Sequence, residues 1–317
     1  MISHVILSWP ALDVAVRCTL LDEINPQLCT SLRQALPIVS VQTHAVVAGE
    51  QIYFPTRLVL DEPDSARTED LAAQPPGRIN FEPFFQYLSV NYGPVSESVP
   101  AWPVAQVVDA DLPRLPRVGE RIWKNLLHEE HAVHVVVSEG DAPAGVPVAP
   151  TEARAFAPPS PTLTATELTA FFSSEIDRIW LCEPHDARAL RTGRAATHAG
   201  VGRQYFSPWV MAAGLVRGLA VVDLPTLRRS LSPERFDTRV ATELLAELLR
   251  VPAGVMGYFG LPELGAVLEV VRASCSHFED RGELRQLLDA FGTYSNRYNL
   301  WLHQGFPWRL GVGFPRE

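Results

Sequence analysis

The chain of 317 residues is long enough for one large domain or two ordinary ones, and its composition (47% hydrophobic, 20% charged) is typical of a soluble globular protein. A formal net charge of −9 argues against nucleic-acid or anionic-membrane partners, which select for basic surfaces. The four cysteines form no C-x-x-C pair, and we see neither a basic leader nor an apolar run of about 18 residues. We therefore predict a cytoplasmic protein with reduced thiols and no membrane span.

Residues 1–138 predict a β-rich domain. Alternating or β-branched runs indicate strands at 5–9, 14–21, 39–47, 51–56, 77–92, 100–109 and 132–137. Asn25 and Pro26 are typical of a helix N-terminus, and leucines at 28, 32 and 36 continue one apolar stripe. The polar stretch 60–76 predicts a loop, whereas 120–127 fits either a strand or a short helix.

Prolines at 143, 147, 150, 158, 159 and 161 predict a linker over residues 139–163. From residue 164 to 317 the apolar period becomes helical. Helices are expected at 166–182, 237–249, 262–275 and 281–291, with a short helix or a turn at 186–194. The stretch 207–218 is apolar and rich in small residues. The aromatic tail that follows is predicted to end in an extended strand, WRLGVGF, which returns to the β-rich domain. The apolar helix faces exceed what one such domain needs to cover, so we predict a homodimer.

One short stretch, Gly77–Glu97, gathers residues suited to chemistry. It contains Arg78, Tyr87 and Tyr92 and ends in a lone carboxylate after a Tyr-Gly-Pro turn. Burial raises the pKa of a carboxyl, so Glu97 at the rim of an aromatic pocket could transfer protons. The pattern alone favours the plainer alternative, a solvent-facing turn residue.

Other motifs predict little specific chemistry. HEEHAVH, at 128–134, is not H-E-x-x-H and fits a solvated strand entry better than a zinc site, so no metal is expected. There is no G-x-G-x-x-G or phosphate loop, and no cofactor is expected. His44 lies in an apolar strand, where a hydrogen-bonded core histidine and a pocket residue are equally compatible with the pattern.

The order of motifs in the first half resembles the cyclophilin-like barrel of small bacterial proteins. It runs through VAVRCTLL, DEINP, SLRQALP, HAVVAGEQIYFP, GRINFEP and YLSVNYGP, and it covers roughly residues 14–137. The residue set of peptidyl-prolyl isomerases is missing, so the resemblance carries no isomerase activity. It implies an α+β fold, a cyclophilin-like β-barrel with an appended α-helical region.

Such a barrel, followed by helices in a chain of this length, resembles two enzyme groups. Bacterial Pictet–Spengler β-carboline synthases condense tryptophan with an aldehyde or keto compound, and cucumopine- or mikimopine-type opine synthases condense histidine with a keto acid. The first group uses a glutamate base helped by an arginine and a histidine. The resemblance places the glutamate at Glu97 and the arginine at Arg78. Tyr87 stands at the position of the histidine, so Tyr87, Tyr92 or His44 would supply the second acid or base.

The leading hypothesis is therefore a cofactor-free cyclase acting on tryptophan or a methylated tryptophan in alkaloid biosynthesis. Two arginines would bind the substrate carboxylates, Arg78 and, as a second candidate, Arg57. Aromatic walls for the indole are expected from Phe84, Phe85, Tyr87, Trp102 and Trp123, with Tyr92 nearby. An opine-type synthase and a non-catalytic ligand-binding barrel are the alternatives.

Overall fold

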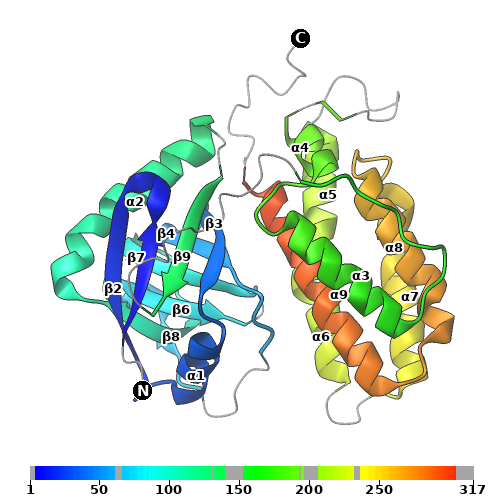
Figure 1. Cartoon of the computed structure of the whole chain (residues 1–317), viewed down its shortest axis with the longest axis horizontal. Coiled ribbons are helices and arrows are strands. Elements are labelled where there is room, and N and C mark those ends of the chain that lie inside the picture. The colour runs from blue at the N-terminus through cyan, green and yellow to red at the C-terminus, as the bar shows by residue number, and fades with distance from the viewer. Residues whose placement is uncertain are drawn as a thin grey trace. The chain divides into compact units, whose positions relative to one another are not determined.

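The computed structural model describes residues 4–60, 66–83, 85–129, 132–139, 153–192, 194–195, 206–231 and 236–304 (Figure 1). The chain divides into two compact units, residues 1–149 and residues 150–317. The first is built on strands and the second on helices (Figure 1).

The first unit is a closed antiparallel barrel. Its strands in the described residues are β1 (His4–Trp9), β2 (Val14–Leu20), β3 (Ile38–His44), β4 (Gly49–Pro55), β5 (Glu69–Asp70), β6 (Arg78–Glu82), β7 (Tyr87–Val95), β8 (Pro100–Val107) and β9 (Val133–Ser138). They follow the order β2-β1-β9-β3-β4-β7-β6-β8-β5, and β2 also pairs with β8. That pairing closes eight strands into a barrel, and the two-residue β5 extends the sheet beside β8.

The alternation of each strand separates an apolar inner face from an outer face. Ile52, Val90 and Ile79 are register partners across β4, β7 and β6 and are buried in the core. Two helices complete this core, α1 (Pro26–Gln34) and α2 (Leu115–Lys124). Leu115, Val118 and Ile122 on one face of α2, for example, are at most 1% exposed.

In the barrel unit the structure decides one alternative that the sequence left open and corrects one expected loop. The undecided stretch around 120–127 is helical, because Pro116 lies in the first turn and the apolar positions follow helical spacing. A short π-helix, Asn125–Glu129, continues α2. The expected loop at 60–76 contains β5 and the 3-10 helix η2 (Leu71–Ala73), which is capped by the Asp70 carboxylate.

The second unit is helical. Its main elements are α3 (Ala165–Ile179), α4 (His185–Arg191), α5 (Phe206–Arg217), the π-helix η6 (Gly218–Asp223), α6 (Leu224–Ser230), α7 (Thr238–Val255), α8 (Pro262–Ser274) and α9 (Arg281–Leu302). Side-chain caps start three of them. Thr164 and Glu167 form a capping box at α3, while Asp237 and Asp280 accept from backbone amides at the starts of α7 and α9. The expected α+β architecture, a barrel with appended helices, is confirmed.

Helix α9 is longer than the sequence predicts. Its aromatic residues from Tyr294 to Trp301 were expected in an extended tail but are helical and buried. Phe172 of α3 stacks on Phe291 at 4.9 Å between ring centroids, and Tyr294 lies 5.2 Å from the same ring. The predicted strand WRLGVGF lies outside the described residues, as does most of the 139–163 linker.

One continuous helical stretch, Pro208–Ser230, is long and apolar enough to cross a membrane by length and composition, with a mean hydropathy of 1.6. We expected no such span, because Arg217 and Asp223 interrupt the apolar run. The core helix of a soluble protein has the same properties. In this stretch 39% of the most apolar window is buried. Trp209, Val216 and Leu224 lie in the helical core, whereas Val210, Met211 and Val222 are exposed.

Candidate functional site

Glu82 is a buried carboxyl at the end of a barrel strand, and it was not predicted as a site residue from the sequence. It is the last residue of β6, and its side chain is 8% exposed. Burial raises the pKa of Glu82 from 4.5 to about 8. Among the described residues its carboxyl group makes no hydrogen bond or ion pair. At neutral pH such a group holds a proton that it can give up and take back.

Aromatic rings stand beside Glu82. Tyr87 is its register partner on β7 and also pairs with Pro55 of β4. The Tyr87 ring stacks on Phe85 at 5.4 Å and lies 4.8 Å from Tyr53. The structure thus brings together Tyr87 and Phe85, both predicted site residues, and adds Tyr53. Phe84 lies outside the described residues.

Two buried hydroxyls lie in the next row of the same outer face. The register aligns Thr43, Tyr53, Ser89 and Asn80 across β3, β4, β7 and β6. Thr43 is 2% exposed and Ser89 0%, and neither side-chain oxygen has a hydrogen-bond partner among the described residues. A buried polar group without a partner costs about 1–3 kcal/mol, so these hydroxyls are available to a ligand at low cost.

An amide network on the same face fixes the strands. Gln74 donates to Asn80 at 2.8 Å and accepts from Asn91 at 3.0 Å, and Gln51 donates to Asn91 at 2.9 Å. Arg78 forms an ion pair with Glu69 at 2.9 Å, with only 14% of its side chain exposed. The predicted carboxylate clamp is therefore already engaged by a carboxylate of the chain itself.

Glu97 lies in the connection between β7 and β8 and is half-buried. The connection is anchored at both ends, because the Ser96 amide donates to Ala48 O at 2.8 Å and the Leu71 amide to Val99 O at 2.9 Å. Glu97 makes no ion pair with any residue that the structure describes. Its catalytic role stays a prediction.

His44, Tyr92 and Trp123 form a separate cluster on the inner side of the sheet. His44 pairs with Ile52, which places it on the opposite face from Thr43. Its Nε2 lies 2.8 Å from the Tyr92 hydroxyl, and its ring lies 4.7 Å from Trp123. Burial lowers the pKa of His44 and raises that of Tyr92 to about 12. Both groups are therefore neutral at pH 7.

The remaining predicted residues, Trp102 and Arg57, differ in burial. Trp102 is 7% exposed and packs in the barrel core. Arg57 is exposed and lies two residues past Pro55, the β4 partner of Tyr87. Among the described residues no three His, Cys, Asp or Glu side chains are grouped as metal ligands would be. Two positions of the HEEHAVH segment, 130 and 131, lie outside the described residues.

The alternation in RINFE predicts that Arg78, Asn80 and Glu82 share one face of the strand, but it does not predict whether that face is buried or exposed to solvent. Polar residues on a strand face are usually assumed to be exposed to solvent. The sequence signal that could have indicated burial of Glu82 is the group of aromatic residues close to it in sequence, Phe81, Phe85 and Tyr87.

Two comparisons with known proteins find similarity, one over the helical unit and one over nearly the whole chain. Residues 165–305 match the family described as the cucumopine synthase C-terminal helical bundle domain. The structure of McbB in complex with tryptophan superposes with a TM-score of 0.84 and 28% sequence identity, covering 97% of this chain and 98% of McbB. McbB is a Pictet–Spengler β-carboline synthase, so the resemblance to that group and to the opine synthases is confirmed.

Two further comparisons add nothing to this assignment. The solution structure of the hypothetical protein AF2241 from Archaeoglobus fulgidus reaches a TM-score of 0.30 at 15% identity, over 44% of this chain and 95% of that one. A likeness at that level carries no argument. No curated protein sequence matches this chain.

Proposed function

We propose that this chain, which shares its architecture with McbB, is a Pictet–Spenglerase that condenses tryptophan or a methylated tryptophan with an aldehyde or keto acid. The product would be a tetrahydro-β-carboline, an alkaloid precursor. The observation that carries the proposal is the Glu82 carboxyl, which lacks a partner among the described residues, has a pKa raised to about 8 and lies beside aromatic rings. Its support is the similarity to McbB, whose structure holds tryptophan.

The reaction can use one carboxyl twice. The amine adds to the carbonyl to give a carbinolamine, and protonated Glu82 gives its proton to the departing hydroxyl, which leaves as water. The indole carbon attacks the resulting iminium. The Glu82 carboxylate then takes the proton from the indole carbon that formed the new bond, which restores both the aromaticity of the indole and the protonated acid. These steps consume no cofactor by their own stoichiometry. A raised pKa suits the first role, because the group must enter the cycle protonated.

Substrate contacts follow from the same face. The rings of Tyr53, Phe85 and Tyr87 are suited to stacking on indole. The hydroxyls of Thr43 and Ser89 would bond the polar end of the amino acid. Arg57 stays the candidate for a substrate carboxylate.

The test is incubation with tryptophan and a panel of aldehydes and keto acids, read by mass spectrometry, for wild type, Glu82→Gln and Glu97→Gln in parallel. We expect a condensation product from wild type and its near loss in Glu82→Gln. Loss of product in Glu97→Gln but not in Glu82→Gln would show that Glu97, the residue predicted from sequence, is the catalytic base. No product with any pair would overturn the proposal.

An opine-type synthase acting on histidine is the second candidate, favoured by the family match over residues 165–305. Adding histidine to the same panel separates the two. A non-catalytic binding barrel would hold tryptophan without turnover. Homodimer formation and cytoplasmic location stay predictions, the first open to size-exclusion chromatography with light scattering.

A further inference from the structure

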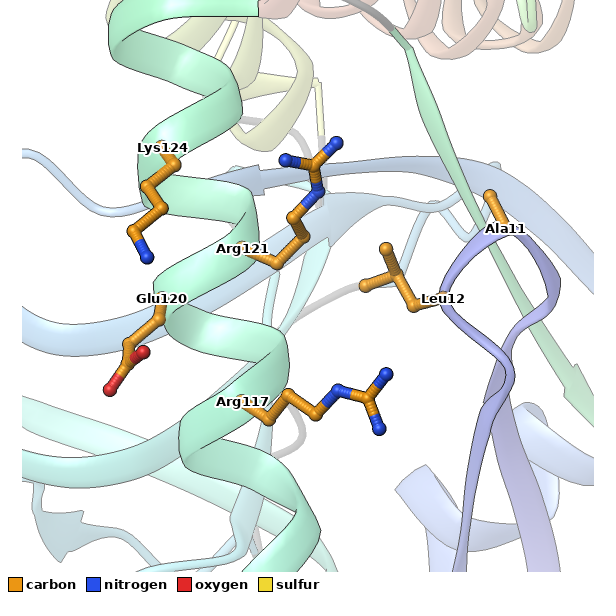
Figure 2. A pocket seen from close by; sticks show the side chains of 6 residues that line it. All are labelled: Ala11, Leu12, Arg117, Glu120, Arg121 and Lys124. Atoms are coloured by element: carbon orange, nitrogen blue, oxygen red, sulfur yellow. The ribbon is translucent and has the colours of Figure 1, made fainter.

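A cavity of about 370 Å³ lies on the barrel unit, between α2 and the turn that joins β1 to β2. That turn is the 3-10 helix η1 (Pro10–Leu12). Figure 2 shows Arg117 and Arg121 reaching from α2 towards Ala11 and Leu12, while Glu120 and Lys124 project from the other side of the helix in this view. We propose that this cavity is a binding site for a small multivalent oxyanion, a compact polycarboxylate or a phosphate compound.

The charge of the cavity is opposite to that of the protein. Its lining holds three cations, Arg117, Arg121 and Lys124, and one carboxylate, Glu120. The chain as a whole carries a net charge of −9, and Lys124 is its only lysine. A polyanion such as nucleic acid would be repelled by the rest of the surface. A small anion would experience mainly this local excess of positive charge.

Neighbouring arginines of the barrel unit already bind a carboxylate of the chain. Arg17 and Arg114 both contact the buried Asp111 carboxylate, at 2.9 and 3.5 Å. Arg117 and Lys124 make no ion pair or hydrogen bond with any residue the structure describes. Arg117 and Arg121 are four positions apart on one helix, where like charges repel by a few tenths of a kcal/mol. An anion between them would remove that repulsion.

The arrangement of the two arginines indicates which class of ligand the cavity would bind. Two guanidinium groups on consecutive turns can each bind an oxyanion through a fork of two N–H donors. A ligand with two anionic groups can therefore offer a separate group to each fork, whereas a single carboxylate would have to share its two oxygens between both arginines. Leu12 and Ala11 form a small apolar wall opposite, suited to a compact carbon backbone. This inference goes beyond the condensation proposed above and does not depend on it.

The experiment is calorimetric titration at low salt, about 50 mM, where exposed charges are least screened. Wild-type protein receives citrate, inorganic pyrophosphate or acetate. We expect saturable binding of citrate, pyrophosphate or both with Kd below about 1 mM, and no saturable binding of acetate. Citrate alone would identify a polycarboxylate site, and pyrophosphate alone a phosphate site.

The matched variants are R117Q/R121Q and, as control, R239Q, which removes an exposed arginine from α7. We expect the double variant to bind at least about tenfold more weakly, and R239Q to bind as wild type does. R117K/R121K keeps the charge without the forks and should bind more weakly than wild type, which tests the geometry should the glutamine variant misfold. Absence of saturable binding, full affinity in either double variant, or equal weakening by R239Q would overturn the proposal.

Discussion

The two units each bury a carboxyl of raised pKa, but they treat it differently. Glu82 in the barrel has a pKa of about 8 and no bonding partner in the described part of the chain. Asp186 in the helical unit has a pKa of about 6, and it accepts hydrogen bonds from the Tyr298 hydroxyl and from the amides of Ala187 and Glu263. Burial dominates both shifts. The contrast separates a carboxyl engaged in internal hydrogen bonds from one that the described residues leave unbonded.

The largest expected effect is on activity, in Glu82→Gln. A positioned proton-transfer group contributes about 100- to 10,000-fold, so product formation should fall by that factor. Glutamine keeps the shape, so the circular dichroism spectrum should match wild type. Turnover within threefold of wild type would show that Glu82 is as structural as Asp186.

Arg178→Ala should cause the largest loss of stability. Arg178 is 5% exposed and binds Glu175 at 2.8 Å and Glu263 at 3.1 Å. Its removal leaves buried carboxylates unpaired, which costs about 3–5 kcal/mol in the free energy of unfolding. Urea denaturation measures this, with exposed Arg239→Ala as control. A loss under about 1 kcal/mol would mean that water already compensates the pair.

Stability should also depend on pH through Glu82. The folded pKa of Glu82 is about 8 against an ordinary 4.5, so between these values the folded state binds more protons than the unfolded state. Its contribution to stability is therefore intact below about pH 4.5 and is lost as pH rises towards 8, by up to about 1.4 kcal/mol per pH unit. The difference in unfolding free energy between wild type and Glu82→Gln should follow that curve. A difference independent of pH would contradict the burial of an ionisable Glu82.

Tyr298→Phe removes the hydroxyl that donates to Asp186 and should cost about 1.5–3 kcal/mol, the range for hydrogen bonds to charged groups. The matched control is Tyr294→Phe. The Tyr294 hydroxyl is equally buried, yet none of the described residues partners it. That change should be neutral or stabilising. Equal losses in the two variants would show that packing, not the bond to Asp186, sets the cost.

The smallest effects on stability are expected from replacing two fully buried serines, Ser274 in the helical unit and Ser89 in the barrel. Ser274 Oγ donates to Val270 O at 2.7 Å and accepts from the Leu163 amide at 2.9 Å, so Ser274→Ala should cost about 1 kcal/mol. Ser89→Ala should leave stability within about 0.5 kcal/mol, because its hydroxyl lacks a protein partner in the described structure. If Ser89 binds substrate, the KM for tryptophan should rise in Ser89→Ala and stay unchanged in Ser274→Ala. An unchanged KM would remove Ser89 from the site.

Much of the fold could be predicted from the sequence because its local signals agree. Helix α8 begins at Pro262 as expected, and α7 begins beside the predicted Asp237. Helix ends were harder to place. α7 passes through Pro252. α9 runs on to Leu302, because tertiary packing of its buried aromatic residues outweighs the local preferences that would stop it.

The candidate site could be predicted only in part. Tyr87 and Phe85 were identified and do lie together, since aromatic residues close in sequence on one strand end must be close in space. His44 and Tyr92 were grouped with them, but strand parity places His44 on the inner face. Glu82 was not predicted because its raised pKa is caused by burial under other atoms of the protein. The RINFE segment carries no sequence signal for that burial.

Barrel closure has a consequence for how the protein is made. The closing pair joins Cys18 to Val107, and Ile6 pairs with Ser138. The first two strands emerge from the ribosome long before their partners in β8 and β9. Until then one of their edges stays open, and an open edge invites pairing with another chain. Contacts this distant in sequence also slow folding. Co-translational yield of the barrel should therefore depend on chaperones that shield β1 and β2 more than on the stability of the finished protein.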